Sequence, residues 1–319
     1  MGCYQTLLGD IGGTTARFAV LIGDRLGPID HVAVSGHRTA IDAIGRFLKR
    51  ADRSRIGRAI LGVAGPVEGG RCLITNSHWL TDAGELSAAF GFKSTKLIND
   101  FEGIAWALPH LRAHDVKPIA GGQEVPGEPM VVIGPGTGLG MAGLLGRGGD
   151  MTVIATEGGH ATLPTTTPRE DAVIAHLRGR FGHVSAERAL SGPGLENLYA
   201  AIAAIDEAAV ASRSAAEITR LALDRSCPTC RAAVDMFCAM LGTVAGNLAL
   251  MFRARGGVYL AGGIVPRMAD YLAQSEFRAR FEAKGRFRDY VRSVPTTVIV
   301  NPDAAFLGLK SLAEVVPAS

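Results

Sequence analysis

The sequence predicts an α/β protein of two domains, and three observations lead to this fold class. The chain has 319 residues, more than one typical domain. Short apolar runs alternate with segments of helical periodicity along most of its length, as in proteins whose strands and helices alternate. Two similar strand–glycine–strand units, at residues 6–21 and 131–145, indicate that the domains are related halves.

The first domain is expected to begin with a β-hairpin. Apolar runs over residues 6–11 and 15–21 flank the small residues Gly12, Gly13 and Thr14, a pattern typical of two strands with a polar tip. Further along we expect a helix over 39–50, a buried strand over 59–63, a strand ending at residue 98, a helix over 101–108 and a connection containing Pro and Gly over 111–129.

The second domain repeats the hairpin, and helices follow it. The tip of the unit at 131–145 contains Gly136, Thr137 and Gly138. Beyond it we expect helices over about 169–182, 195–205, 214–224 and 231–253, a strand over 258–261 that ends in Gly262 and Gly263, a strand over 297–300, and a C-terminal helix over 304–315.

Composition excludes several other classes of protein. With 33 Lys and Arg against 30 Asp and Glu, the net charge is +3 and no basic block stands out, so we expect neither a nucleic acid nor a membrane as partner. The apolar stretch 236–252 contains Gly242 and Asn247, which favours a buried helix over a membrane span. With no secretory signal recognisable, we expect a cytoplasmic protein.

The 41 glycines gather in short clusters after apolar runs, but they do not form the two commonest nucleotide motifs. No glycine is followed by Lys-Ser or Lys-Thr at the spacing of a Walker A loop. A dinucleotide fingerprint beginning at Gly134 would need glycine at position 139, where Leu139 stands. These absences argue against a P-loop NTPase and a Rossmann dehydrogenase.

Phosphate binding at the two hairpin tips remains as the interpretation of these clusters. Small residues let backbone N–H groups converge on phosphate oxygens, and Thr14 and Thr137 add hydroxyl donors. Asp10 would repel phosphates unless a cation lay between them, which suggests Mg²⁺ bound through water. The alternative is a pair of ordinary turns that use Gly and Asp for local geometry.

Four polar residues are candidates for chemistry on an alcohol. Asp100 follows Asn99 at a strand end, where it could accept a hydroxyl proton or simply cap a helix, and the sequence leaves both open. Glu157 and His160, three residues apart, lack the spacing of a zinc protease and, with Glu187, could bind vicinal hydroxyls of a sugar. For Glu187 an ordinary surface charge is the alternative.

The cysteines suggest neither a disulfide framework nor a zinc site. Their number is odd, and Cys227-Pro-Thr-Cys230 is a CxxC motif without a second Cys or His pair at metal spacing. We expect reduced thiols, with a redox pair as the alternative. The five are Cys3, Cys72, Cys227, Cys230 and Cys238.

Together these segments resemble one family. The matching motifs are Gly9-Asp10-Ile11-Gly12-Gly13-Thr14, Leu97-Ile98-Asn99-Asp100-Phe101, Gly134-Pro135-Gly136-Thr137-Gly138-Leu139-Gly140, Glu157-Gly158-Gly159-His160, Ser185-Ala186-Glu187-Arg188 with Ser191-Gly192-Pro193-Gly194, and Ala261-Gly262-Gly263-Ile264. In this order they resemble the bacterial glucokinase family, the ATP-dependent hexokinase type within the sugar kinase–chaperone–actin superfamily.

The resemblance implies a two-domain, actin-like ATPase (ribonuclease H-like) fold with the sugar in an interdomain cleft. It implies a small domain over residues 1–110 plus 303–319, a large domain over 111–302, and a homodimer. The implied reaction is ATP- and Mg²⁺-dependent phosphorylation of D-glucose at its 6-hydroxyl. Alternatives are a kinase for another hexose, such as fructose or an N-acetylated sugar, and a catalytically silent sugar-sensing regulator.

The resemblance also implies a role for each candidate. Asp100 would be the general base, and Mg²⁺ would bind at Asp10 through water. The implied sugar-binding residues are Asn99, Asp100, Glu157, His160 and Glu187. The implied ATP-binding residues are Gly9, Asp10, Ile11, Gly12, Gly13, Thr14, Gly136, Thr137, Gly138, Gly262 and Gly263. The chain departs from the family pattern at Thr15 and at Ala161-Thr162-Leu163, and the second departure lies beside the implied sugar site.

Overall fold

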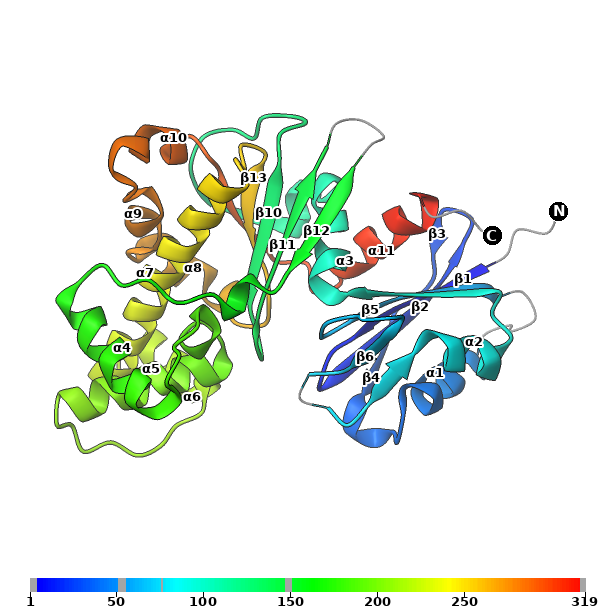
Figure 1. Cartoon of the computed structure of the whole chain (residues 1–319), viewed down its shortest axis with the longest axis horizontal. Coiled ribbons are helices and arrows are strands. Elements are labelled where there is room, and N and C mark those ends of the chain that lie inside the picture. Colours follow the sequence, from blue (N-terminus) through cyan, green and yellow to red (C-terminus); the bar gives the residue numbers. More distant parts are fainter. Residues whose placement is uncertain (1–4, 51–55, 76, 147–150, 316–319) are drawn as a thin grey trace. The chain divides into compact units, whose positions relative to one another are not determined.

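The computed structural model describes residues 5–50, 56–75, 77–146 and 151–315. The chain divides into two compact units, in which residues 1–112 and 301–319 form unit 1 and residues 113–300 form unit 2 (Figure 1). The sequence-based boundaries were placed at 110 and 303. Because unit 2 is inserted between the two segments of unit 1, the two ends of the chain belong to the same unit.

Unit 1 is built on a mixed sheet with strand order β3-β2-β1-β5-β8, and β4 pairs with β2. Strands β1, β5 and β8 are parallel, whereas β2 returns antiparallel to β1 through the predicted first hairpin. The strands are β1 (Gln5–Ile11), β2 (Thr15–Ile22), β3 (Arg25–Leu26), β4 (Asp30–Ala33), β5 (Ile56–Val63) and β8 (Ser94–Asn99), with a separate ribbon of β6 (Arg71–Leu73) and β7 (Leu80–Asp82).

The helices of unit 1 come from both ends of the chain. They are α1 (Ala40–Leu48), α2 (Ala83–Phe90), α3 (Asp100–Ala107) and α11 (Ala304–Val315), with 3₁₀ turns η1 (Val34–Gly36) and η3 (Leu108–His110). Helix α11 packs directly on α3, because a Cβ at Gly308 would collide with the carbonyl oxygen of Gly103 (Figure 1). Glycine at position 308 therefore allows the two helix backbones to touch.

Unit 2 contains a second sheet with the order β12-β11-β10-β13-β14-β9. Its central part repeats the plan of unit 1, because β10 and β11 form an antiparallel hairpin and β10, β13 and β14 are parallel. The predicted internal repeat is therefore confirmed. The strands are β9 (Val116–Ala120), β10 (Met130–Pro135), β11 (Leu139–Leu145), β12 (Thr152–Thr156), β13 (Gly257–Leu260) and β14 (Thr296–Ile299).

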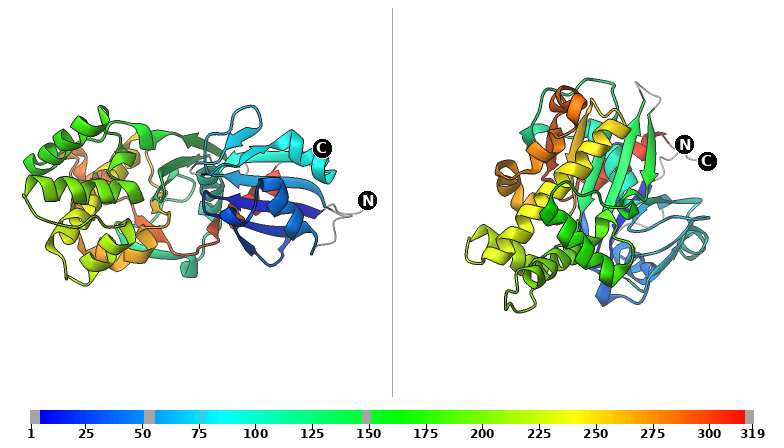
Figure 2. Two further views of the ribbon diagram at one scale, coloured as in Figure 1. Left: turned by 90° about the horizontal axis from the view of Figure 1, so that it is seen from below. Right: turned by 60° about the vertical axis from the view of Figure 1, so that its left-hand side comes forward.

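Helices α4 to α7, green to yellow in Figure 2, pack against one another beside this sheet. The helices are α4 (Pro168–Phe181), α5 (Gly192–Ile205), α6 (Ala215–Leu223), α7 (Pro228–Met251), α8 (Ala269–Gln274), α9 (Phe277–Glu282) and α10 (Arg288–Arg292), with 3₁₀ turns η4 (Ala113–Asp115), η5 (Gly158–His160), η6 (Ala186–Arg188), η7 (Val265–Met268) and η8 (Gly285–Phe287). Helix α7 is long and apolar enough to cross a membrane, but 72% of its most apolar window is buried within the protein, as predicted for a core helix.

The expected connection over 111–129 is partly wrong, since it contains strand β9. Pro118 lies within this strand and cannot donate a ladder hydrogen bond. The strand is nevertheless formed because it lies at the edge of the sheet and pairs only with β14. The sequence analysis also missed β12 and the short helices α8 to α10, whose five or six residues are too few to show a helical period.

Candidate functional site

In unit 1, Asp10 and Asp100 lie near the carboxyl ends of parallel strands. Asp10 pairs with Gly62 across β1 and β5, and Gly62 pairs with Ile98 across β5 and β8. Asp100 begins helix α3 directly after β8, and a Cβ on Gly62 would lie 3.7 Å from its Cα. Open α/β sheets bind ligands at the carboxyl ends of their strands, so these carboxylates occupy a suitable place for a reaction centre.

The structure resolves which residue caps α3. Asn99 is the N-cap, and its Oδ1 accepts a hydrogen bond from the backbone nitrogen of Phe101 at 2.9 Å. Its Nδ2 donates to the carbonyl oxygen of Gly65 at 3.1 Å, which ties the end of β8 to the loop after β5. The N-cap alternative for Asp100 is therefore wrong, although its Oδ1 also accepts from Phe101 N at 3.0 Å.

Asp100 is half-buried, and its charge acts on a neighbouring thiol. Burial, and secondly the negative charge of Asp100, raise the pKa of Cys72 to about 11. A thiol with this pKa remains protonated at neutral pH. The Asp100 carboxylate therefore lies near a neutral, buried thiol rather than near a second reactive group.

Asp10 is buried and held by a cation that the sequence analysis did not single out. Its Oδ2 lies 2.7 Å from a terminal nitrogen of Arg17, its partner across the hairpin. Arg17 also contacts Asp303, at 3.3 Å, and the carbonyl oxygen of Pro302. Burial raises the pKa of Asp10, the Arg17 guanidinium opposes this shift, and the nearby Asp303 carboxylate adds to it.

The residues around Asp10 fit a magnesium ion that keeps most of its water. Two carboxylates, Asp10 and Asp303, share one guanidinium, so a further positive charge would be favourable. Within the described ranges, no group of three or more His, Cys, Asp or Glu side chains could hold a metal. Mg²⁺ is usually bound by one or two carboxylates together with water and substrate phosphates, which matches this set.

The first hairpin divides into a packed strand and an accessible tip. Gly9 lies inside β1, where a Cβ would approach Leu61 Cδ2 to 2.6 Å, and Ile11 is fully buried. Their side-chain positions therefore serve packing. Gly12, Gly13 and Thr14 form the tip, where Gly12 is partly and Thr14 fully exposed. The tip is the part of this motif that a ligand can approach.

In unit 2, the second hairpin tip meets two glycine segments from distant parts of the chain. The backbone nitrogen of Gly192, at the start of α5, donates to the Gly136 carbonyl oxygen at 2.8 Å. Gly262 has φ +87°, and a Cβ there would collide with the carbonyl of Pro135. Gly263 N lies 3.9 Å from the place of a Gly136 Cβ, so the predicted segments at 136–138 and 262–263 are neighbours.

Glu187 is bound to this tip and is not an isolated surface charge. It lies in η6, and its Oε2 accepts a hydrogen bond from the backbone nitrogen of Leu139 at 2.9 Å. A Cβ on Gly138 would lie 2.5 Å from the same oxygen. One carboxylate oxygen is therefore held in place by the hairpin.

Glu157 and His160 lie on η5, which is joined to the same end of the sheet. Gly159 packs so closely that a Cβ would collide with the carbonyl oxygen of Leu139. The Ala186 backbone nitrogen donates to Ala161 at 2.8 Å, which links the segment after η5 to η6. His160 Nε2 lies 3.8 Å from Glu157 Oε2, and both side chains are about 60% exposed, at 62% and 61%. Unit 2 thus presents an acid and an imidazole that are available to a ligand.

We expect the substitution Gly138→Ala to destabilise this site. The added methyl group must displace the Glu187 carboxylate from Leu139 N, at a cost of about 1–3 kcal/mol for overpacking. The Tm from calorimetry should fall as Glu187 moves. Gly136→Ala is the matched control for stability, since its Cβ would have no neighbour closer than 3.9 Å. Equal Tm values for the two variants would contradict the contact.

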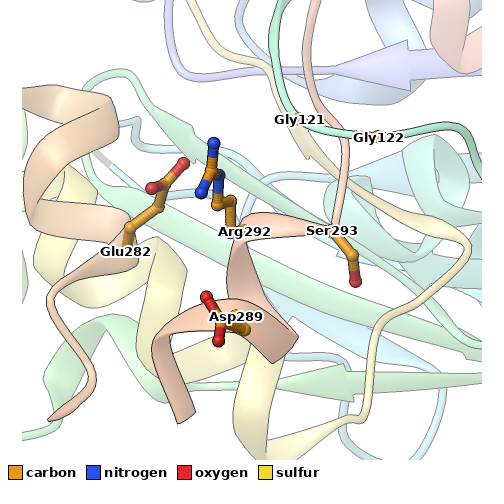
Figure 3. A pocket seen from close by; sticks show the side chains of 6 residues that line it. All are labelled: Gly121, Gly122, Glu282, Asp289, Arg292 and Ser293. Atoms are coloured by element: carbon orange, nitrogen blue, oxygen red, sulfur yellow. The ribbon is translucent and has the colours of Figure 1, made fainter. Parts of the chain in front are cut away.

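An open pocket of about 480 Å³ in unit 2 contains none of these residues. Figure 3 shows the side chains of Glu282, Asp289 and Arg292 around it. Glu282 is already bound by Arg278 Nε at 2.7 Å. The pocket is lined by Gly121, Gly122, Glu282, Asp289, Arg292 and Ser293. This hollow is therefore separate from the hairpin tips and from the carboxylates described above.

Comparison with known proteins decides the family. A family model described as glucokinase matches residues 7–315. The chain belongs to the glucokinase family. It is 45% identical to a glucokinase from Nitrobacter hamburgensis over 96% of both chains. A crystal structure of glucokinase from an Antarctic psychrotroph is 34% identical and has a TM-score of 0.87, covering 98% of this chain and 99% of that one.

Membership in the glucokinase family establishes both fold and reaction class. The actin-like α/β fold and the resemblance found in the sequence are confirmed, and the chain is a kinase that phosphorylates glucose. A ROK family glucokinase from Streptomyces griseus, solved in complex with glucose and AMPPNP, is 20% identical with a TM-score of 0.64, covering 97% of this chain and 98% of that one. This more distant likeness concerns the fold alone.

Proposed function

We propose that the enzyme transfers the γ-phosphoryl group of ATP to the 6-hydroxyl of D-glucose, giving glucose 6-phosphate and ADP as the first step of glycolysis. Family membership supports the reaction class. The observation that carries the mechanism is the position of Asp100. This residue is half-buried, directly follows the carboxyl end of β8, and lies beside Gly62 of the neighbouring strand β5. We also propose a cytoplasmic homodimer, as the resemblance to the glucokinase family implies.

Asp100 is the proposed general base. Phosphoryl transfer to an alcohol needs an acceptor for the hydroxyl proton, and an aspartate beside the acceptor is a common solution. Its carboxylate has one oxygen near Phe101 N, at 3.0 Å, and this contact orients the group at the first turn of α3. The carboxylate thus lies at the positive end of the α3 dipole, which favours a negative charge there.

The hairpin tips are the proposed phosphate-binding elements. In the tips at residues 12–14 and 136–138, the Gly12 and Gly136 N–H groups close the turns by donating to the carbonyl oxygens of Thr15 and Gly138. The remaining tip N–H groups and the hydroxyls of Thr14 and Thr137 would bind phosphate oxygens. Asp10 would hold Mg²⁺ through water, and the ion when bound would neutralise charge on the phosphates. Gly262 and Gly263, beside the second tip, would border the adenosine.

Glucose hydroxyls are the proposed ligands of Asn99, Glu157, His160 and Glu187. Glu157 and His160 are exposed enough to bind a sugar, and Glu187 keeps one oxygen on Leu139 N while the other remains for a hydroxyl. The side-chain amide of Asn99 donates one hydrogen to the Gly65 carbonyl oxygen, and its second amide hydrogen would bind a sugar hydroxyl.

We expect Glu157→Gln to raise the KM for glucose with a smaller change in kcat. A neutral amide accepts hydrogen bonds from hydroxyls more weakly than a carboxylate, and such a charge-assisted bond contributes about 1.5–3 kcal/mol. The KM should rise roughly tenfold or more, measured by coupled assay of ADP release. Glu207→Gln, at an exposed site in the same unit, is the control. An unchanged KM in E157Q would remove Glu157 from the sugar site.

A panel of sugars tests the proposed substrate against its alternatives. ADP release is measured with glucose, fructose, mannose and N-acetylglucosamine at equal concentration. Preference for glucose supports the proposal. Preference for another hexose would indicate that the change in sugar specificity lies near Ala161-Thr162-Leu163, where the chain departs from the family pattern. Absence of turnover with every sugar would contradict a kinase and favour the silent regulator.

A further inference from the structure

The Cys227-Pro-Thr-Cys230 motif has no part in the proposed reaction, and the structure places it at the start of helix α7. Cys227 is the N-cap residue, and its sulfur accepts a hydrogen bond from the backbone nitrogen of Cys230 at 3.4 Å. Cys227 is partly exposed, whereas Cys230 is fully buried. The chain thus pairs one accessible sulfur with one protected sulfur.

The two sulfurs are close enough to be joined without rebuilding the helix. The two thiols are hydrogen-bonded to each other, so their sulfur atoms are in contact. The Cys227 sulfur already reaches the nitrogen of Cys230, which is two bonds from the Cys230 Cβ. A metal site is a poorer interpretation of the two cysteines, because no third ligand side chain accompanies them in the described part of the chain.

The surroundings make the two thiols chemically unequal. Burial opposes ionisation of Cys227, but hydrogen bonds from the Cys230 backbone and thiol, the Arg213 guanidinium and the Thr229 N–H together hold its pKa below the ordinary value. Burial, followed by the hydrogen bond to Cys227 and the charge of Cys227, raises the pKa of Cys230 to about 12. Of the two thiols, Cys227 is therefore the one that ionises more readily and is the better nucleophile.

Arg213 is fixed where its charge can act on this pair. Its Nε donates to the hydroxyl oxygen of Tyr199 at 3.2 Å, and that hydroxyl donates to the carbonyl oxygen of Ala211 at 3.1 Å. The exposed Glu217 carboxylate, which caps α6, also faces the guanidinium and weakens its effect. The charged and titratable groups around the motif are thus Arg213, Glu217 and Tyr199, together with the two thiols.

We propose that Cys227 and Cys230 form a redox-active dithiol, in which Cys227 is the nucleophile toward a hydroperoxide and Cys230 is the resolving cysteine. The Cys227 sulfur attacks one peroxide oxygen, the O–O bond breaks, and the departing hydroxide takes up a proton to form water. The Cys230 sulfur then attacks the resulting sulfenic sulfur. An S–S bond replaces the S–O bond, and the released hydroxide leaves with the Cys230 thiol proton as a second water.

The site is tested in the full-length reduced protein with hydrogen peroxide and iodoacetamide, followed by peptide mass mapping. Cys72 and Cys238 are internal controls, because burial first, together with nearby carboxylates, raises their pKa values to about 11 and about 12. We expect Cys227 to be alkylated at neutral pH at least about tenfold faster than either. Peroxide should yield a Cys227–Cys230 disulfide. Equal alkylation rates, or no such disulfide, would overturn the proposal.

Two single variants separate the roles of the sulfurs. Cys230→Ser should accumulate a sulfenic acid at Cys227 that dimedone traps, and Cys227→Ser should leave Cys230 unoxidised. Serine is a good N-cap, so Cys227→Ser keeps the start of α7 folded. Arg213→Gln should slow alkylation of Cys227, whereas Arg220→Gln, which removes an exposed partner of Asp224, should not. Oxidation of Cys230 in C227S would reverse the assignment.

Discussion

The variant Asp100→Ala is expected to lose on the order of 10²–10⁴-fold in kcat while it remains folded. The loss follows from the proposed role, since without a carboxylate no positioned group takes the proton of the 6-hydroxyl as the phosphoryl group arrives. The fold should survive because Asn99, not Asp100, caps helix α3. Initial rates of ADP release at saturating glucose and ATP measure kcat, and circular dichroism reports the fold.

Asp42→Ala is the matched control for this variant. Asp42 also lies in the first turn of a helix, α1, but it is exposed, and only its backbone nitrogen takes part in the cap, bonding to Thr39 at 3.1 Å. Removing either aspartate deletes a carboxylate near a helix N-terminus, which costs about 0.3–1 kcal/mol of stability. Only Asp100→Ala should change kcat. Near-normal turnover in D100A would exclude Asp100 as the base.

The second large effect is expected for Asp10→Asn, with kcat/KM for the magnesium nucleotide reduced by about 10²–10³-fold. The neutral amide removes one of the two carboxylates around Arg17 and leaves a single carboxylate, Asp303, already paired with the guanidinium, so the excess negative charge that would attract a divalent cation is lost. Initial rates against total Mg²⁺ at fixed ATP measure the effect. The midpoint of the titration should move to higher Mg²⁺.

Two measurements keep this result interpretable. Thermal unfolding is recorded in parallel, because the change leaves the Arg17 guanidinium without its nearest carboxylate and costs about 1–3 kcal/mol. Asp30→Asn removes a carboxylate of the same unit that binds the exposed Arg50 at 3.4 Å, and it should leave the Mg²⁺ titration unchanged. A titration of D10N that coincides with wild type would contradict a role for Asp10 at the metal.

The hairpins and the strand end at Asn99 were the parts of the fold that local sequence could predict. Glycine and threonine between apolar runs specify a turn through short-range preferences alone, and both tips lie where those residues predicted. Asp100 was likewise placed correctly at the start of a helix. Its competing reading as the N-cap failed because Asn99, one residue earlier, offers an equally good side chain.

The contacts that complete each candidate group depend on distant sequence and could not be predicted in the same way. Glu187 binds Leu139 across 48 residues, and no local pattern marks that hydrogen bond. Asp303 reaches Arg17 from the other end of the chain. Arg17 itself was accessible to prediction, because the expected hairpin register places it opposite Asp10. The residue that pairs with Asp10 across the predicted hairpin is Arg17, so strand register alone is enough to identify it.

The return of helix α11 to unit 1 has a consequence for synthesis of the protein. Its buried side chains Phe306, Leu309 and Leu312 cover a unit whose other residues are synthesised by residue 112, long before the helix itself. At ordinary translation speeds the intervening segment takes roughly ten to forty seconds to produce. During that interval the nascent N-terminal half exposes an apolar surface that attracts chaperones, and a fragment truncated at residue 112 would keep that surface permanently.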